Sequence, residues 1–153
     1  MKPITYEQAI HRLAALCSQR ERCIQDICQK LTLWKFSEKD QKKIIQYLQN
    51  ERFLDEKRFS KAYANDKFKY NQWGIYKIKY ELKKKQIPDH LIMDALAQID
   101  SKENRKQLRQ LLESKRKTIK GKNECEINQK LIRFANSRGF PLEDIEAVIS
   151  SSY

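Results

Sequence analysis

The stretch GIYKIKYELKKKQIPDHLIMDAL, residues Gly74 to Leu96, predicts two helices separated by a short turn. Ile78 and Leu82 are apolar and four positions apart, which places both on one face of a helix. Pro88 then suits the start of a new helix, because the N–H that proline lacks would have no helical partner there. We therefore expect a helix, a tight turn and a second helix.

The same pattern occurs twice more, in CIQDICQKLTLWKFSEKDQKKIIQYL from Cys23 and in CEINQKLIRFANSRGFPLEDIEAVI from Cys125. In every copy, apolar residues lie nine and five positions before a bulky apolar residue, and a serine or proline follows at once. The three sets are Ile27, Leu31, Phe36 and Ser37; Ile78, Leu82, Ile87 and Pro88; and Leu131, Ala135, Phe140 and Pro141.

The helix that follows each turn also carries a matching apolar pair. The pairs are Ile92 with Leu96 and Ile145 with Ile149, whereas the first copy reaches Ile44 and Leu48 three residues late. We interpret this delay as a three-residue insertion.

Each copy is preceded by a further amphipathic stretch, over residues 5–20, 57–69 and 102–117. Asp55, Gly74 and Ser101 are expected to cap helices at their N-termini. Three helices thus recur three times with a period of roughly fifty residues. The sequence predicts an all-α fold of three tandem three-helix repeats forming an elongated, curved array, with units at 1–53, 54–100 and 101–153. A single compact nine-helix bundle is the alternative.

Composition supports long helices and a cytoplasmic location. The 153 residues include only three glycines and three prolines, and no run approaches the roughly 20 apolar residues of a membrane span. The N-terminal MKPITYEQAIHRL carries charges where a signal peptide needs apolar residues. We expect no membrane partner, and reduced thiols at the four cysteines.

The net charge of +12 is concentrated in two segments. Residues 57–85 hold ten Lys or Arg against two acids, and residues 102–122 hold nine against two. Seven of the fifteen aromatic residues also lie in the first of these segments. Such a combination favours a surface that binds a polyanion or an acidic protein groove.

A helical wheel over Gly74 to Lys85 places two tyrosines among lysines on the side opposite the buried stripe. The simpler interpretation is that these tyrosines pack on the preceding helix and the lysines only solubilise the surface. The candidate binding residues are Tyr76, Lys77, Tyr80, Lys83 and Lys84, with a second patch at Lys115, Arg116, Lys117 and Lys120.

The sequence carries no recognisable catalytic motif. His11 and His90 are isolated, and glycines at only 74, 121 and 139 exclude a phosphate-binding loop. The cysteine spacing matches neither CxxC nor a zinc site. We therefore expect no enzyme activity, no metal and no cofactor.

The run ERFLDEKRFSKAYANDKF, followed by WGIYKIKYELKKKQIP, resembles the signature of the RecX family of bacterial RecA modulators. Ser60 replaces the family's usual alanine and Gln86 its usual glycine, both expected at surface or helix-end positions. The matching residues are Leu54, Asp55, Glu56, Arg58, Phe59, Gly74, Lys77, Ile78, Glu81, Leu82, Lys85 and Ile87, with Arg138, Gly139 and Phe140 near the C-terminus.

This resemblance implies a cytoplasmic monomer that lodges in the groove of the RecA nucleoprotein filament, beside its DNA. Such proteins lower RecA's ATP hydrolysis, strand exchange and co-protease activity, and so act in DNA repair, homologous recombination and the SOS response. Capping of filament ends and coating of the groove both remain open. A basic helical DNA-binding protein that acts without RecA is the alternative.

Most signature residues are expected to be structural. Leu54, Phe59, Ile78, Leu82 and Ile87 have the spacing of core residues. We consider two roles for the Arg58 guanidinium: an ion pair with Asp55 or Glu56, or contact with a partner.

Overall fold

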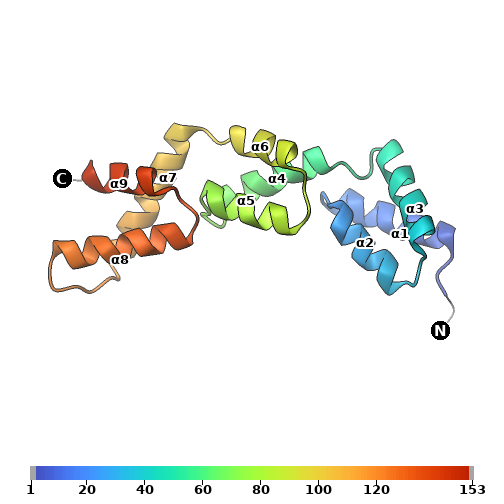
Figure 1. The fold of residues 1–153 in the computed structure, drawn as a ribbon, viewed down its shortest axis with the longest axis horizontal. Helices are drawn as coiled ribbons and strands as arrows, with labels where there is room; N and C mark the ends of the chain where they lie inside the picture. Colours follow the sequence, from blue (N-terminus) through green and yellow to red (C-terminus); the bar gives the residue numbers. More distant parts are fainter. Residues whose placement is uncertain (1–2, 152–153) are drawn as a thin grey trace.

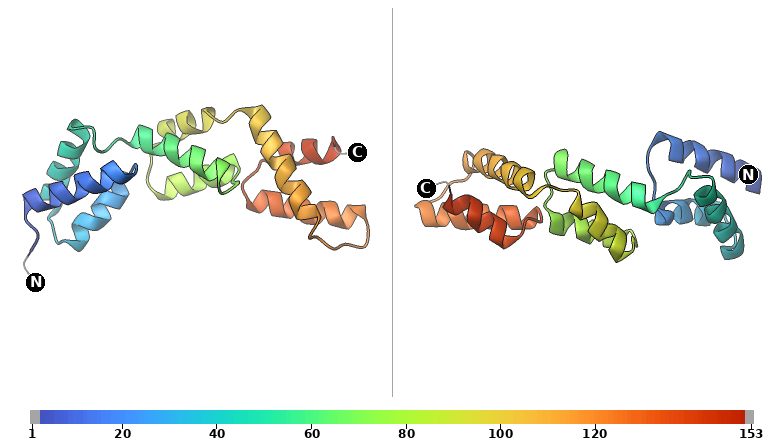
Figure 2. Two further views of the ribbon diagram at one scale, coloured as in Figure 1. Left: turned by 180° about the vertical axis from the view of Figure 1, so that it is seen from behind. Right: turned by 90° about the horizontal axis from the view of Figure 1, so that it is seen from above.

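The computed structural model describes residues 3–151, and within this range it consists of nine helices and no strand. Figure 1 shows three units in a row, with the chain termini at opposite ends and the middle unit at the crown of a shallow arch. The views in Figure 2 confirm that the row is elongated rather than closed into a bundle. The predicted all-α tandem array is therefore confirmed, and the compact-bundle alternative is wrong.

Each unit contains three consecutive helices. The first contains α1 (Tyr6–Gln19), α2 (Ile24–Leu33) and α3 (Glu38–Asn50). The middle unit contains α4 (Glu56–Lys69), α5 (Ile75–Lys84) and α6 (Asp89–Ala97). The third contains α7 (Ser101–Arg116), α8 (Glu124–Ser137) and α9 (Leu142–Ser150). Within residues 3–151, no helix has both the length and the apolarity that crossing a membrane requires.

Three separate hydrophobic clusters hold the units together. The first includes Leu13, Ile27, Leu31 and Ile44; the second Phe59, Ile78, Leu82 and Ile92; and the third Leu108, Leu131, Phe140 and Ile145. Cys23 of the first unit packs into the second cluster, and Leu54, at the proposed limit between the units, packs into the first. The limits at 53/54 and 100/101 remain our proposal.

Local capping explains where several helices begin. Thr5, Ser37, Asp55 and Asn123 each accept a hydrogen bond from a backbone N–H in the first turn of the helix that follows. Gly74 takes the predicted position before α5. The prediction for Ser101 is wrong, because Asp100 occupies the cap position and Ser101 is already helical.

The repeat extends to the backbone of the turn between the second and third helices. The N–H of Phe36, Ile87 and Phe140 donates to the carbonyl five residues earlier, over 3.0, 3.2 and 3.2 Å. The residue before each donor has a positive φ: 65° at Lys35, 62° at Gln86 and 92° at Gly139. This left-handed helix ending turns the chain in the same way in all three units.

The prediction of a three-residue insertion in the first unit is wrong. Helix α3 begins directly after Ser37, as α6 follows Pro88 and α9 follows Pro141. Gln41 occupies the helix position at which the other two units have the first apolar residue of the pair. Its side-chain amide donates to the Phe36 carbonyl over 2.9 Å. Helix α3 is instead longer, with 13 residues against nine in each of the other two.

The buried positions of α6 and α9 also differ from the prediction by one residue. Ala95 and Val148 are buried, whereas Leu96 and Ile149 are only partly buried. The first residue of each predicted pair, Ile92 or Ile145, is buried as expected.

Candidate functional site

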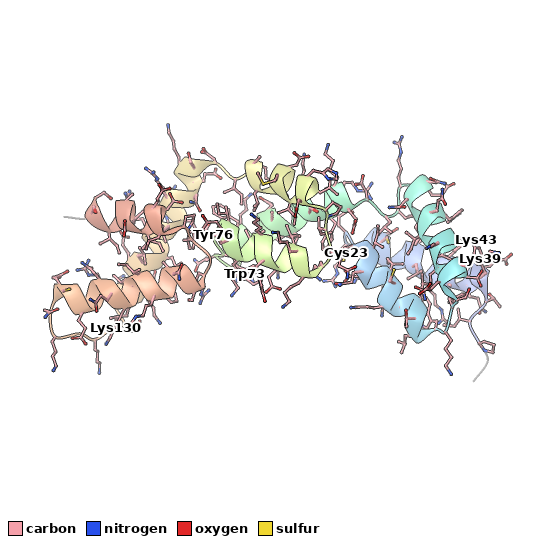
Figure 3. The ribbon with its side chains drawn as sticks, viewed as in Figure 1. Cys23, Lys39, Lys43, Trp73, Tyr76 and Lys130 are labelled. Atoms are coloured by element: carbon pink, nitrogen blue, oxygen red, sulfur yellow. The ribbon has the colours of Figure 1, made fainter. Side chains whose placement is uncertain are left out.

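Helix α5 presents its two tyrosines to solvent. Ile78 and Leu82 are fully buried, while the exposed fractions of Tyr76 and Tyr80 are 57% and 62%. The tyrosines therefore do not pack away against α4, as the simpler interpretation supposed. Figure 3 shows Tyr76 at the N-terminal end of α5, next to the third unit.

The lysines of α5 divide between two sides of the helix. On the side towards Trp73, the Lys77 ammonium lies 4.8 Å from the centre of the Trp73 ring. Lys84 lies 5.4 Å from the Tyr80 ring and 3.7 Å from the Glu81 carboxylate. Lys83 is exposed, and at 100° per residue it falls on the other side, between Tyr76 and Lys79. Lys77 thus faces the Trp73 ring, whereas Lys83 lies on the flank of the helix next to Tyr76.

The surface around Trp73, which we name the lysine–aromatic strip, lies between α4 and α5. Tyr63 and Trp73 stack edge to face with ring centroids 6.5 Å apart. The Lys67 ammonium lies 5.4 Å from the Tyr63 ring and 5.1 Å from the Trp73 ring, and Lys85 lies 6.0 Å from Tyr63. The strip consists of Tyr63, Lys67, Trp73, Lys77 and Lys85.

Cation–π contacts hold the strip's ammonium groups over the rings and so fix their positions. Burial against the core of the middle unit raises the pKa of the Tyr63 hydroxyl to about 12. The arrangement therefore offers positive charge beside flat apolar rings, which suits phosphates and bases. The sequence did not single out Tyr63, Lys67, Trp73 or Lys85 as candidates, although all four lie in the basic, aromatic-rich segment.

The second patch lies where α7 ends. Lys115 is partly buried with its ammonium 4.7 Å from the Phe134 ring, and Arg138 lies 5.1 Å from the same ring. Arg116 forms an ion pair with Glu124, so part of its charge is neutralised. Lys117 and Lys120 are exposed.

The second patch lies along α8 rather than on α5. Arg116 pairs with Glu124 in the first turn of α8, whereas the Lys115 ammonium reaches the Phe134 ring near the other end of this helix. Arg138 lies over the same ring, and its carbonyl accepts from the Gly74 N–H just before α5. The patch therefore extends along the third unit towards its junction with the middle unit.

The two signature glycines meet at the junction of the middle and third units. The Gly74 N–H donates to the Arg138 carbonyl over 2.7 Å, and the Tyr76 N–H donates to the Gly139 carbonyl over 2.9 Å. A Cβ on Gly74 would overlap the backbone of Gly139 and Phe140, and one on Gly139 would overlap Lys77. Both positions need glycine because backbone packs on backbone there.

The apolar signature residues lie in the cores. Leu54, Phe59 and Ile87 expose at most 6% of their surface, Ile78 and Leu82 none, and Phe140 is fully buried. Asp55 caps α4 by accepting from the N–H groups of Lys57 and Arg58 over 2.9 and 3.2 Å.

Arg58 pairs with neither of the acids expected for it. Its Nε lies 3.0 Å from the Glu21 carboxylate of the first unit, and its Nη2 donates to the Arg52 carbonyl over 2.9 Å. Glu56 instead accepts from the Ile24 N–H over 3.1 Å. Burial raises the pKa of the Glu56 carboxyl, and this hydrogen bond partly opposes the shift.

The two departures from the family pattern have different environments. Ser60 is fully buried, which contradicts the expected surface position, and its hydroxyl is satisfied by donating to the Glu56 carbonyl over 2.7 Å. Gln86 is exposed just after α5, as expected, but has a φ of 62°. The usual glycine would adopt that conformation without strain.

Models of known protein families match the middle and third units of this chain. Residues 55–96 match the model of the second three-helix domain of RecX, and residues 103–149 match that of the third. The chain belongs to the RecX family. These matches cover α4–α6 and α7–α9, including the lysine–aromatic strip and the glycine contact.

Relatives in the family support this assignment. A regulatory protein RecX from Clostridium perfringens (strain SM101 / Type A) is 29% identical over 78% of this chain, which spans only 57% of that protein. One from Vibrio campbellii is 29% identical over 88% of this chain and 85% of its own length. The crystal structure of RecX from Lactobacillus salivarius covers 95% of both chains with a TM-score of 0.86 at 20% identity, which shows a shared fold.

Proposed function

We propose that this protein is a non-enzymatic regulator that binds the RecA nucleoprotein filament and inhibits RecA's ATPase, recombinase and co-protease activities. The proposal is supported by membership of the RecX regulatory family. The observation that carries it is the lysine–aromatic strip on the middle unit of an elongated array. Regulation would then occur in the cytoplasm, during DNA repair, by occupancy of the filament rather than by chemistry.

The strip and its neighbours have the chemistry for contact with DNA in the filament. Lys67 and Lys77 lie over the Trp73 ring, and can attract phosphates while the ring edge contacts sugars or bases. The second patch, on the third unit, would add further contacts to the filament. An extended monomer could therefore contact the filament through two of its units.

The first test is ATP hydrolysis by the cognate RecA on single-stranded DNA, with this protein titrated from well below RecA's concentration. The salt concentration is set so that the protein does not sequester bare DNA. Strong inhibition at substoichiometric amounts supports the proposal and favours action at filament ends. No effect at equal stoichiometry contradicts it.

A triple variant tests the α5 lysines. Lys77→Ala, Lys83→Ala and Lys84→Ala together should leave the melting temperature nearly unchanged and weaken inhibition about tenfold, through lost phosphate and carboxylate contacts. The matched control is Lys39→Ala, Lys42→Ala and Lys43→Ala, which removes the same charge from exposed positions of α3. Equal inhibition by both triple variants would contradict a specific role for α5.

Binding to nucleic acid without RecA is the second candidate. The pI near 9.6 and the strip's cation–π pairs favour it. Affinity for bare DNA would then fall steeply with salt and would not depend on RecA. Fluorescence anisotropy of labelled single-stranded DNA, with and without RecA, separates the two candidates.

A further inference from the structure

A shallow apolar groove runs between α5 and α6, on the side of α5 that faces away from Trp73. It has a volume of about 320 Å³ and is lined by Ile75, Tyr76, Lys79, Met93, Leu96 and Ala97. We name it the α5–α6 groove. Tyr76 and Met93 expose 57% and 61% of their surface, so two large apolar side chains flank it in contact with solvent. Contiguous exposed apolar surface of this kind marks binding sites more often than single residues do.

The other two units show that the fold does not require this apolar surface. In the repeat, the position of Tyr76 is taken by Gln25 in the first unit and Gln129 in the third. The position of Met93 is taken by Lys42 and Glu146. The same helix pair therefore forms with polar residues at both places, so the fold itself does not require the exposed side chains of Tyr76 and Met93.

The charges around the groove distinguish between classes of partner. Helix α5 contributes Lys79 to the lining and Lys83 beside it, whereas α6 contains Asp89 and Asp94 but no Lys or Arg. A nucleic-acid strand in the groove could pair its phosphates only with the lysines of α5, because α6 offers no cation, and it would leave the apolar lining unused. A protein segment can place an apolar side chain in the groove and a carboxylate towards the lysines.

We propose that the α5–α6 groove receives an apolar side chain of a protein partner, flanked by a carboxylate that meets Lys79 and Lys83. This inference rests on the proposed function, in which the partner is a RecA protomer in the filament. The middle unit then has two different surfaces: the lysine–aromatic strip contacts DNA, and the groove contacts protein. Methionine suits such a groove because its flexible thioether adapts to the shape of the partner.

Two double variants test the groove with residues that the repeat itself tolerates. Tyr76→Gln is combined with Met93→Lys in one variant and with Met93→Glu in the other. Leu33→Gln, which removes an exposed apolar side chain at the end of α2, is the matched control. Inhibition of RecA's ATPase, binding to bare single-stranded DNA and melting by circular dichroism are measured for each variant and for wild type.

We expect both double variants to inhibit RecA about tenfold less than wild type, because both remove the apolar contact. Their melting temperatures and the Leu33→Gln control should match wild type, and binding to bare DNA should change far less than inhibition does. Wild-type inhibition in both double variants would overturn the groove proposal. A second outcome would also overturn it: the variant with Met93→Lys binds DNA and inhibits RecA more strongly than wild type, and the variant with Met93→Glu does both more weakly. Nucleic acid would then occupy the groove. If wild type itself does not inhibit RecA, the proposed function fails first.

Discussion

Between the middle and third units, backbone meets backbone, whereas between the first and middle units the contacts depend on charged side chains. At the first of these junctions, Gly74 and Tyr76 donate to the carbonyls of Arg138 and Gly139 over 2.7 and 2.9 Å. No Cβ fits on either glycine without overlap. The relative position of these two units is therefore set by close contact of main-chain atoms, which salt and pH change little.

The junction between the first and middle units has a different basis. Arg58 pairs with Glu21 over 3.0 Å, Lys85 lies 3.7 Å from Asp26, and Glu56 accepts from the Ile24 N–H over 3.1 Å. The apolar contacts there are Cys23, which packs into the middle cluster, and Leu54, which packs into the first. Partly exposed ion pairs are screened by salt, so this junction should respond to ionic conditions.

The comparison shows that one repeat can be joined to its copies in two ways. A junction made by glycine backbone is sensitive to added volume, and one made by ion pairs is sensitive to charge.

Gly139→Ala should destabilise the protein by about 2 to 4 kcal/mol, because a Cβ there is strained at a φ of 92° and overlaps the backbone of Lys77. Urea unfolding measures the loss. Gly121→Ala is the control, since its backbone is not left-handed and its new Cβ would come closest to a side-chain atom, Ile127 Cγ1, rather than to backbone. Similar losses in both variants would show that the glycine junction is not as tight as the structure indicates.

Arg58→Ala should cost about 1 kcal/mol or less in low salt, because it removes a partly exposed ion pair with Glu21. In about 1 M NaCl most of this difference should disappear, since screening already weakens the pair. Hydrogen exchange at the Ile24 amide reports opening of the junction. Arg105→Ala removes a longer pair with Asp144 inside the third unit and serves as the control. Faster exchange at Ile24 in both variants would contradict a local role for Arg58.

Gln86→Gly should stabilise the protein by about 0.5 to 1 kcal/mol. Glycine relieves the left-handed backbone at a φ of 62°, although it also makes the unfolded chain more flexible. Gln46→Gly, at an exposed position inside α3, should instead destabilise by about 1 kcal/mol. Thermal melting distinguishes the two signs, and a loss of stability in Gln86→Gly would contradict the shared turn geometry.

The smallest effect concerns pH at the ion-pair junction. Burial raises the pKa of Glu56 in the folded protein, so the folded state holds a proton more tightly than the unfolded state. Stability from this group is present below the ordinary glutamate pKa of about 4.3 and is lost as the pH rises through the raised value. Wild type should therefore lose stability relative to Glu56→Gln as the pH rises through this window.

Melting temperatures of wild type and Glu56→Gln across the acidic range test this sign. Glu51→Gln, which removes an exposed carboxyl just after α3, is the control. If the melting temperature of wild type instead rises relative to that of Glu56→Gln as the pH rises, the raised pKa of Glu56 is contradicted.

Much of the fold could be predicted from local patterns. The spacing of Ile78, Leu82 and Ile87 recurs in all three units and marks the same helix ending in each. The exposed tyrosines of α5 also followed from the helical wheel. The supposed insertion before Ile44 was wrong because a helix can carry a polar residue, Gln41, at a position that the pattern expects to be apolar.

The candidate site was only partly predictable. Lys77 was identified, but its position over the Trp73 ring depends on how the chain enters α5. Lys67 could not be paired with Trp73 from periodicity, because the two residues lie on either side of the end of α4. Arg58 was assigned to nearby acids, yet it reaches Glu21, 37 positions away.

The sequence by itself determined the nine helices, the repeated turn and the concentration of positive charge in two segments, because each depends on residues a few positions apart. Only the tertiary structure decided that Gly74 meets Gly139, that Arg58 meets Glu21, that Lys77 lies over the Trp73 ring and that Tyr76 lines a groove with α6. These features depend on how neighbouring units and helices pack. Such packing joins residues that are far apart in the chain, and hydrophobic spacing along one helix does not specify which residues will meet.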